Sequence, residues 1–472
     1  MITEAIPRLQ GVPAGPRSHT FRTLRGLVWS ACATGACVIV TYLNPSSLLG
    51  YWYFLAIGLL FFSLFDRSEL KDFAQAYLIN GFLTALYVLA QVHFYPESVG
   101  CTSPLGLQTD DSYFFSLVAD DIPPDLETRE GYFLYTSGFS DLVRFITPFR
   151  VTHPLDVLFF LSIVAGLICV YTQQYALQLT GDKKVARTAY ILCQFCPLML
   201  MNGGAVFVRD TFVGGLLILS LCCINRRRFF AFVCCTLLQF VLRPGTALII
   251  LPLYSLIHVG DVFTGLKSQE ARVRFAFTAL ILAGTVAAVF LWREQLEDLL
   301  ETQGIRLSEF RREGLDDVLM GSGRGTFMWV QEQSLLVRIL LATAYMYLVP
   351  FLALTGLVTQ YGFDSRFLLM NIVYPLWVIP IHAWVIASLF TKQKSSADLR
   401  WMALAFLVGC FLIGAFSLQS RHKVIIQPLL YVLAAAGCHL APREARRAGY
   451  VFSALWFAFQ SGYAIYRMYQ GE

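Results

Sequence analysis

Apolar runs of about 20 residues recur along this chain and are separated by short charged breaks. A bilayer-crossing helix needs roughly 20 such residues, because the hydrocarbon core is about 30 Å thick and offers no partners to backbone polar groups. The repeated runs therefore predict an all-α, polytopic integral membrane bundle. Composition agrees, since 57% of residues are hydrophobic and only 14% are charged, against about 25% charged in soluble domains. These values exclude a water-soluble protein.

The apolar runs predict one polytopic domain over residues 1–472, with about 11 to 13 transmembrane helices. Two short crossing helices are expected within 229–258, where Arg243-Pro244-Gly245 interrupts the run. The other expected spans lie at about 27–43, 48–65, 73–95, 156–179, 187–206, 210–225, 275–293, 366–391, 400–417, 424–440 and 448–466.

Basic residues at the ends of these runs indicate the orientation in the membrane. Cytoplasmic loops carry an excess of Lys and Arg, and four arginines precede the first run. We therefore expect a cytoplasmic N-terminus and two larger extracytoplasmic loops, 96–155 and 294–335. A full crossing by 336–358 would put two later basic clusters outside, so that segment is expected to be re-entrant or interfacial. The chain also lacks an Asn-x-Ser/Thr acceptor, which favours a bacterial inner membrane.

Charge and cysteine content narrow the partners further. The net charge of +5 is small for 472 residues and its basic residues mark helix ends, so no nucleic-acid partner is expected. Eleven of the twelve cysteines lie in or beside apolar runs. Cys193 and Cys196 form a CxxC without a second pair at metal-ligand spacing, so we interpret them as packing residues and expect no metal held by them.

The first external loop contains adjacent carboxylates, Asp110 and Asp111, with Tyr113 close behind. One carboxylate of such a pair can act as a base while its neighbour binds a metal or shifts the first one's pKa. The alternative is a solvated acidic loop, since three further aspartates follow. Asp110 and Asp111 are the candidate catalytic residues. The pattern leaves the cofactor open, and a divalent cation bound at this pair is the candidate.

Basic residues gather at the predicted outer membrane edge. Arg209 precedes Asp210 at a helix end, where the pair serves either as an anchor or as a ligand for phosphate. Arg243 stands before a proline inside an apolar run, a costly place for a charge without a partner or ligand. Both arginines are candidate contacts for an anionic substrate, with Asp210 as a secondary candidate.

A third basic group, Arg421-His422-Lys423, occupies a short turn that we expect outside. Its location opposes the usual preference for basic residues inside, so either the turn binds an anion or the topology is wrong. Arginine's planar fork suits phosphate, and a lipid-linked phosphate would lie at this depth. Arg311 and Arg324 of the second external loop extend the predicted basic surface.

Together these motifs resemble the GT-C superfamily of membrane glycosyltransferases, and most closely the bacterial polysaccharide and O-antigen polymerase-like proteins. The resemblance covers most of the chain in layout and rests on four short motifs: the acidic pair Asp110-Asp111 with Tyr113, the helix-end Arg209-Asp210, the membrane Arg243-Pro244 and the late Ser420-Arg421-His422-Lys423. The chain lacks the large soluble carboxy-terminal domain of oligosaccharyltransferases.

The resemblance implies a polyprenyl-phosphate- or diphosphate-linked sugar donor, a glycan or lipid acceptor, and partner proteins of glycan assembly. Asp110 or Asp111 would then activate the acceptor hydroxyl or position a divalent ion. The donor phosphate would be held by Arg209, Arg243, Arg421, His422 and Lys423.

Two other classes of function fit the same residues. A transporter or flippase for a lipid-linked or anionic solute would use charges within the membrane and often shows an internal repeat, which we do not find. A non-catalytic assembly subunit would use the loops to bind partner proteins. Polysaccharide biosynthesis by a transferase is the expectation that the external charges favour.

Overall fold

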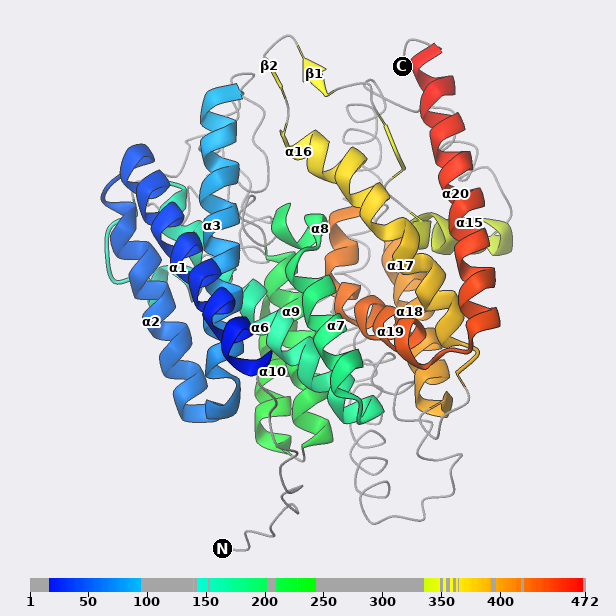
Figure 1. Ribbon diagram of the computed structural model, residues 1–472, viewed down its shortest axis with the longest axis horizontal. Helices are drawn as coiled ribbons and strands as arrows, with labels where there is room; N and C mark the ends of the chain where they lie inside the picture. Colours follow the sequence, from blue (N-terminus) through cyan, green and yellow to red (C-terminus); the bar gives the residue numbers. More distant parts are fainter. Residues whose placement is uncertain are drawn as a thin grey trace, which may run out of the picture.

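The computed structural model is a bundle of helices, most of whose axes are roughly aligned with one another (Figure 1). It describes residues 17–94, 139, 142–151, 153–201, 209–226, 228–242, 335–348, 351–353, 357–359, 362–363, 365–391, 396–416 and 420–469. Within them, five helices are long and apolar enough to cross a membrane: Gly26–Leu43, Ser47–Phe65, Arg67–Phe94, Leu155–Thr180 and Leu369–Ser388. These helices indicate an integral membrane protein, while the predicted total of about 11 to 13 stays a prediction.

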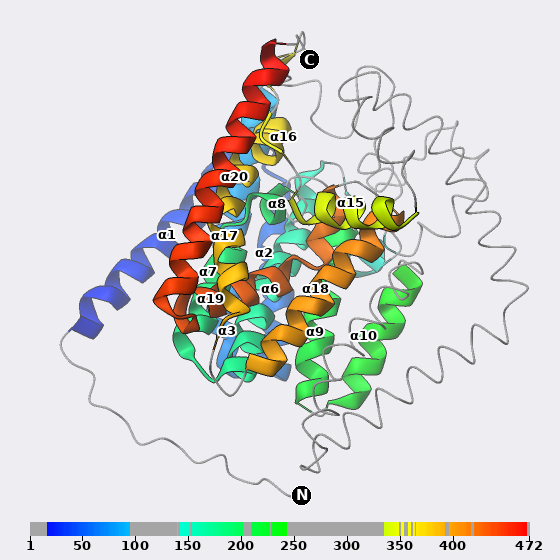
Figure 2. The same cartoon turned by 90° about the vertical axis from the view of Figure 1, so that its right-hand side faces the viewer.

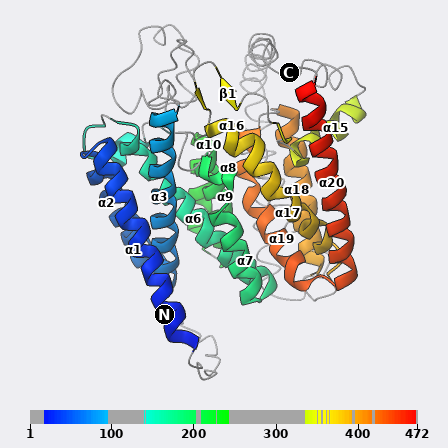
Figure 3. The same cartoon turned by 45° about the horizontal axis from the view of Figure 1, so that its top comes forward.

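The amino-terminal part of the bundle consists of α1 (Arg17–Leu43), α2 (Ser47–Phe65), the 3-10 turn η1 (Arg67–Glu69) and α3 (Leu70–Phe94). The next helix, α6 (Leu155–Thr180), is buried along almost its whole length and contacts α2, α3, α7, α9 and α19. Figure 3 shows α6 with α7 and α9 between the α1–α3 group and the α17–α20 group. The core of the described protein therefore lies around α6.

The segment predicted as one span at 187–206 is interrupted in the structure. Helix α7 (Lys183–Gln194) starts at Asp182, whose side chain accepts hydrogen bonds from two first-turn amides. After α7 ends, the chain turns and α8 (Pro197–Leu200) begins with Pro197 in its first turn. Proline has no amide hydrogen to continue a preceding helix and suits a helix start. The prediction of a single continuous helix over 187–206 was wrong at this break.

Shorter helices follow in the middle of the chain, α9 (Asp210–Asn225), α10 (Phe229–Leu242) and α15 (Leu335–Leu348). Figures 1 and 2 show α15 running across the direction of the long helices. Its 14 residues span about 21 Å, which is less than the roughly 30 Å of a bilayer core. Length and direction both favour the predicted re-entrant or interfacial placement over a full crossing, and that placement stays a prediction.

The carboxy-terminal part holds the one pair of strands among the described residues, β1 (Val358–Thr359) and β2 (Gly362–Phe363), which is a small departure from the predicted all-α fold. It continues with α16 (Ser365–Leu368), a π-helical turn η5 (Leu369–Val373) and α17 (Tyr374–Ser388). Then come α18 (Ser396–Phe416), the 3-10 helix η6 (Ser420–Ile425), α19 (Gln427–Leu440) and α20 (Arg443–Tyr469).

Basic residues lie at the lower end of the bundle in Figures 1 and 2, in the turns that join α2 to α3, α6 to α7, α9 to α10 and α19 to α20. They include Arg67, Lys71, Lys183, Lys184, Arg226, Arg228, Arg443, Arg446 and Arg447. We call this the basic end. The basic turns before α15 and those after it lie at this same end.

Candidate functional site

Several helices extend from the basic end only part of the way along the bundle. Helix α9 has 16 residues and α19 has 14, so they span about 24 and 21 Å, whereas the 26 residues of α6 span about 39 Å. At the ends of α9 and α19 that lie away from the basic end, η6 contacts both helices and also contacts α8. In Figures 1 and 2, α8 and α15 lie below the upper ends of α3 and α20. We call this level the recessed layer.

Two of the predicted charged motifs meet in the recessed layer. Asp210 is the first residue of α9 and His422 lies in η6, and their Oδ2 and Nε2 atoms are 3.8 Å apart. Both side chains are buried. The positive end of a helix dipole stabilises a carboxylate in its first turn, and a protonated histidine stabilises it further. The pair therefore forms a buried acid and base 212 positions apart in sequence.

Close contact between α9 and η6 depends on Gly214. A Cβ atom at this position would lie 3.0 Å from the carbonyl oxygen of Val424 and 3.2 Å from the Cα of Ile425. Both are backbone atoms, which cannot swing aside as a flexible side chain can. Glycine therefore allows the helix to approach η6 closely enough for Asp210 to reach His422.

Arg209 links the start of α9 to the end of α10. Its Nη1 donates a hydrogen bond to the carbonyl oxygen of Leu242 at 3.2 Å. Leu242 is the last residue of α10 and directly precedes Arg243, which is outside the described residues. The side chain of Arg209 thus contacts the residue that directly precedes the Arg243-Pro244 motif in sequence.

Lys423 has an internal partner. Its side chain is fully buried, and Nζ donates to the carbonyl oxygen of Tyr347 at 2.6 Å. The ammonium also lies 6.0 Å from the ring centre of Tyr347 and 5.7 Å from that of Tyr374. Tyr347 belongs to the last turn of α15, where carbonyl groups lack partners within the helix and attract cations. This geometry favours a structural role for Lys423 over the predicted contact with donor phosphate.

The structure adds polar residues that the sequence reasoning missed. His382, in α17, is fully buried and stacks on Tyr347 with ring centres 4.5 Å apart. Its nitrogens lack a well-aligned hydrogen-bond partner among the described residues, although the Tyr347 backbone is nearby. Gln427 donates from Nε2 to the hydroxyl groups of Tyr374 and Tyr431, both at 3.0 Å. A histidine within an apolar run was the available signal for His382.

Other predicted site residues lie outside the described part of the chain, namely Asp110, Asp111, Tyr113, Arg243, Arg311 and Arg324. Arg421 is placed in η6 by its backbone, and its side chain is outside the description. Among the described residues, no group of three or more His, Cys, Asp or Glu side chains is placed to hold a metal ion. The divalent-cation alternative concerns Asp110 and Asp111 and stays a prediction.

The two cysteines of the CxxC are buried in the helical core. Cys196 precedes α8, and its sulfur accepts a hydrogen bond from the amide of Met199 at 3.3 Å. This contact makes Cys196 the cap of a short helix, in keeping with the structural interpretation of the motif.

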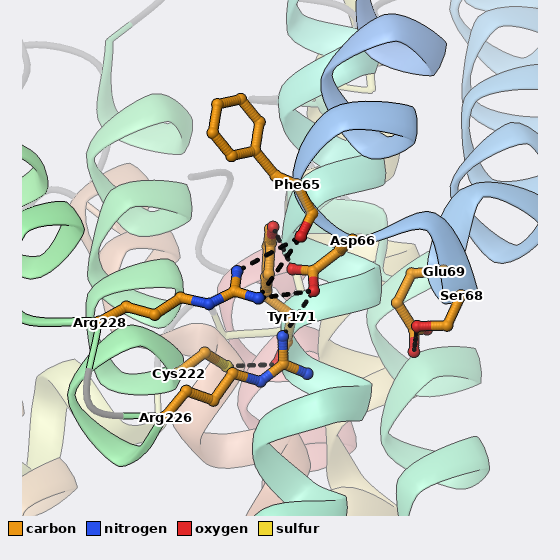
Figure 4. A network of polar contacts seen from close by, with 8 residues as sticks. All are labelled: Phe65, Asp66, Ser68, Glu69, Tyr171, Cys222, Arg226 and Arg228. Carbon is orange, nitrogen blue, oxygen red and sulfur yellow. Dashed lines mark hydrogen bonds and ion pairs between the residues drawn. The ribbon is translucent and has the colours of Figure 1, made fainter. Parts of the chain in front are cut away.

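A second polar network lies at the basic end, where Asp66 accepts from Arg226 and Tyr171 (Figure 4). The sequence identified the individual basic residues as topology signals, but it did not pair them. Arg226 and Asp66 are 160 positions apart, and neither belongs to a recognisable local motif.

Comparison with protein-family models and with curated proteins finds no match for this chain. The functional argument therefore rests on the residues and geometry of the protein itself.

Proposed function

We propose that this protein is a membrane glycosyltransferase or polysaccharide polymerase with a GT-C-like architecture. In this proposal it uses a polyprenyl-phosphate- or diphosphate-linked sugar donor at the extracytoplasmic face of a bacterial inner membrane. The observation that carries the proposal is the contact of Asp210 with His422 in the recessed layer, with Arg209 next to Asp210 at the start of α9. The site combines basic and acidic groups at the ends of short helices rather than in exposed loops.

The depth of this layer suits a lipid-linked phosphate. If the basic end is cytoplasmic, as the excess of Lys and Arg supports, the layer lies roughly 20 to 24 Å from that surface by the lengths of α9 and α19. A bilayer core measures about 30 Å. The layer would therefore lie in the outer leaflet, where a polyprenyl phosphate can approach it laterally while its isoprenoid chain stays in lipid.

The proposed reaction exchanges one glycosyl bond for another. The bond from the sugar's anomeric carbon to the phosphate oxygen breaks, a bond to the acceptor oxygen forms, and the acceptor proton passes to a carboxylate. The lipid phosphate or diphosphate leaves with the bonding electron pair. Arg209, with Arg243, Arg421 and His422, would stabilise that leaving charge, because fixed cations in a poorly hydrated site favour the charged transition state.

Asp110 or Asp111 remains the proposed acceptor base or ligand of a divalent ion in this scheme. The partners would be the lipid-linked donor, a glycan or lipid acceptor, membrane lipids and other proteins of glycan assembly. Tyr113, Arg311 and Arg324 are secondary candidates for contacts with these substrates.

A transporter or flippase of a lipid-linked or anionic solute is the second candidate, and one observation favours it. Lys423 and His382 are both fully buried, and ionisable residues inside membrane bundles often mark transport pathways. Short, interrupted helices that meet within the bilayer are also typical of transporters. The sequence alone indicated that the charges gather outside, so these buried residues strengthen the alternative.

Glycan synthesis in a deletion strain of the source organism tests the enzyme proposal, with each variant at matched membrane abundance. Loss of a charge-assisted contact to the leaving phosphate costs about 2 to 4 kcal/mol, or roughly 30-fold to 1000-fold in rate. We expect Arg209→Ala, Arg421→Ala and one of Asp110→Asn or Asp111→Asn to lose glycan on this scale. Arg443→Ala is the matched control, because Arg443 is exposed at the basic end.

Normal glycan from all four site variants would overturn the enzyme proposal. A liposome assay then separates the alternatives, using the purified protein and a fluorescent prenyl-phosphate lipid. Movement of this lipid between leaflets without any glycosyl transfer would identify a flippase.

A further inference from the structure

Asp66 is a shared acceptor at the basic end of the bundle (Figure 4). It lies in the turn between α2 and α3 and is almost fully buried. Its Oδ1 accepts from Nη1 of Arg226 at 2.8 Å and lies 3.6 Å from Nη2 of Arg228, while its Oδ2 accepts from the Tyr171 hydroxyl at 3.1 Å. A buried carboxylate with two arginines and a hydroxyl is well compensated. We call these four residues the Asp66 clamp.

The clamp joins three separate parts of the protein. Tyr171 belongs to α6, and Arg226 ends α9, where its backbone amide bonds to the carbonyl of Cys222. The sulfur of Cys222 in turn donates to the backbone carbonyl of Tyr171 at 3.3 Å. Both terminal nitrogens of Arg228, Nη1 and Nη2, also donate to the carbonyl oxygen of Phe65 at 3.5 Å. These contacts fix the lower end of α9 against α6 and the end of α2.

A helix is stiff enough to carry this constraint to its other end. Asp210 begins α9 and Arg226 follows it, so the clamp lies about 24 Å from the recessed layer. Sliding α9 along its axis by one turn would move Asp210 by about 5.4 Å. A change of register by one residue would turn the Asp210 position by about 100° around the helix axis. Either change would separate Asp210 from His422, which are 3.8 Å apart in the structure.

The upper part of α9 tolerates little movement as well. Gly214 lies against the η6 backbone, and a neighbouring residue, Gly215, faces the side chains of Ile168 and Val164 of α6. A small shift of α9 would therefore either separate α9 from η6 or make their backbones clash.

We propose that Asp66 is a positioning residue for the recessed layer. By holding Arg226 and Arg228, it sets the height and rotation at which α9 presents Arg209 and Asp210 to η6. Its expected effect on glycosyl transfer rests on the proposed function, whereas its effect on the placement of α9 does not. Asp66 itself lies at the opposite end of α9 from the site and takes no part in the chemistry.

The test compares Asp66→Asn with a reversed pair, Asp66→Arg combined with Arg226→Asp, in the full-length protein in detergent. Hydrogen exchange measured by mass spectrometry reports the placement of α9, and glycan output of the same variants in the deletion strain reports the site. For Asp66→Asn we expect faster exchange confined to residues 209–225 and 420–426. We also expect glycan output to fall roughly 10-fold to 100-fold, as for other small misplacements of reacting groups.

The reversed pair should recover part of the hydrogen-exchange protection and of the glycan output. It restores opposite charges at positions 66 and 226, although Arg228 and the Tyr171 hydroxyl lose the carboxylate of Asp66. Glu444→Gln is the matched control, since Glu444 is an exposed acid at the same end. If Asp66→Asn does not accumulate in membranes, Arg226→Lys provides the same test, because it keeps the charge and loses the planar fork.

Unchanged exchange in 209–225 would overturn the positioning role, and so would faster exchange spread equally over α17 to α20, which indicates general stabilisation. If exchange changes locally while all four site variants keep normal glycan, the proposed function fails and the positioning role stands. If Arg209→Ala loses glycan while Asp66→Asn keeps it and exchanges normally, only the positioning role fails.

Discussion

At the scale of single residues, small side chains and buried charges define the recessed layer. Lys423 shows how much the partner matters, because the same ammonium could bind a phosphate in an exposed turn. The structure instead buries it at the end of α15, on the carbonyl oxygen of Tyr347. His422, its neighbour in sequence, faces Asp210 on a different helix. Adjacent residues of one motif thus have different partners.

Two adjacent glycines in α9 provide a prediction at this scale. Gly214→Ala would place a methyl group 3.0 Å from the backbone oxygen of Val424, whereas Gly215→Ala would meet side-chain carbons of Ile168 and Val164 at 3.3 Å. Because backbone adjusts less easily than side chains, we expect Gly214→Ala to lower glycan output at least 10-fold, about the 1.4 kcal/mol of a modest misplacement. Gly215→Ala should lower it much less.

The measurement is glycan output per unit of membrane protein for both variants. Equal losses from the two substitutions would show that contact with η6 is no more sensitive than contact with α6.

At the scale of elements, glycines also set how closely the carboxy-terminal helices pack. Without strong hydrophobic driving force in lipid, membrane helices associate through close contacts at small residues. In α19, a Cβ atom at Gly437 would overlap the backbone oxygen of Trp384 in α17. At Gly449 of α20, it would lie 2.5 Å from the backbone oxygen of Ala383. Helix α17 is therefore held between α19 and α20 by backbone proximity.

Gly437→Ala should destabilise this three-helix group. The clash involves backbone on both sides, so relief requires the helices to separate, and overpacking of this kind costs about 1 to 3 kcal/mol or more. Gly462→Ala is the matched control, because nothing lies within 4 Å of its added methyl group and alanine favours a helix by up to about 1 kcal/mol.

Thermal unfolding of the purified protein in detergent, followed by circular dichroism, checks this expectation. A midpoint for Gly437→Ala at or above that of the unchanged protein would mean that α17 and α19 do not pack as closely as the structure shows.

At the scale of the whole molecule, the basic turns indicate one membrane orientation. Helix α15 lies across the bundle, and the basic turns before it and after it lie at the same end, as Figures 1 and 2 show. The orientation itself rests on the excess of Lys and Arg in those turns.

Cysteine labelling in intact cells tests this orientation. A membrane-impermeant thiol reagent should label Cys101, which lies in the predicted external loop 96–155. It should also label a cysteine introduced at Ser322 in a Cys101→Ser background. A cysteine at Lys183, which is exposed in the turn between α6 and α7, should react only after permeabilisation. Labelling of position 183 alone in intact cells would reverse the orientation.

The sequence by itself determined where most described helices lie. Expected spans at 48–65, 156–179 and 210–225 agree closely with α2, α6 and α9, because a helix in lipid must be continuously apolar and its charged ends mark where it stops. The external position of Asp110 and Asp111, which would carry the catalytic role, stays a prediction from the same pattern. Sequence also marked Arg209, Asp210, His422 and Lys423 as unusual, since charges near apolar runs need compensation.

Only the tertiary structure decided how those charges are compensated. Pairing of Asp210 with His422, of Lys423 with Tyr347 and of Asp66 with Arg226 joins residues 76 to 212 positions apart. Such pairing depends on the relative height and rotation of separate helices, which the apolar pattern of each helix leaves open. Close packing at glycines, such as that of Gly214 against η6, fixes the height and rotation of the helices. At such a glycine the two backbones touch directly, so only a narrow range of helix positions is possible.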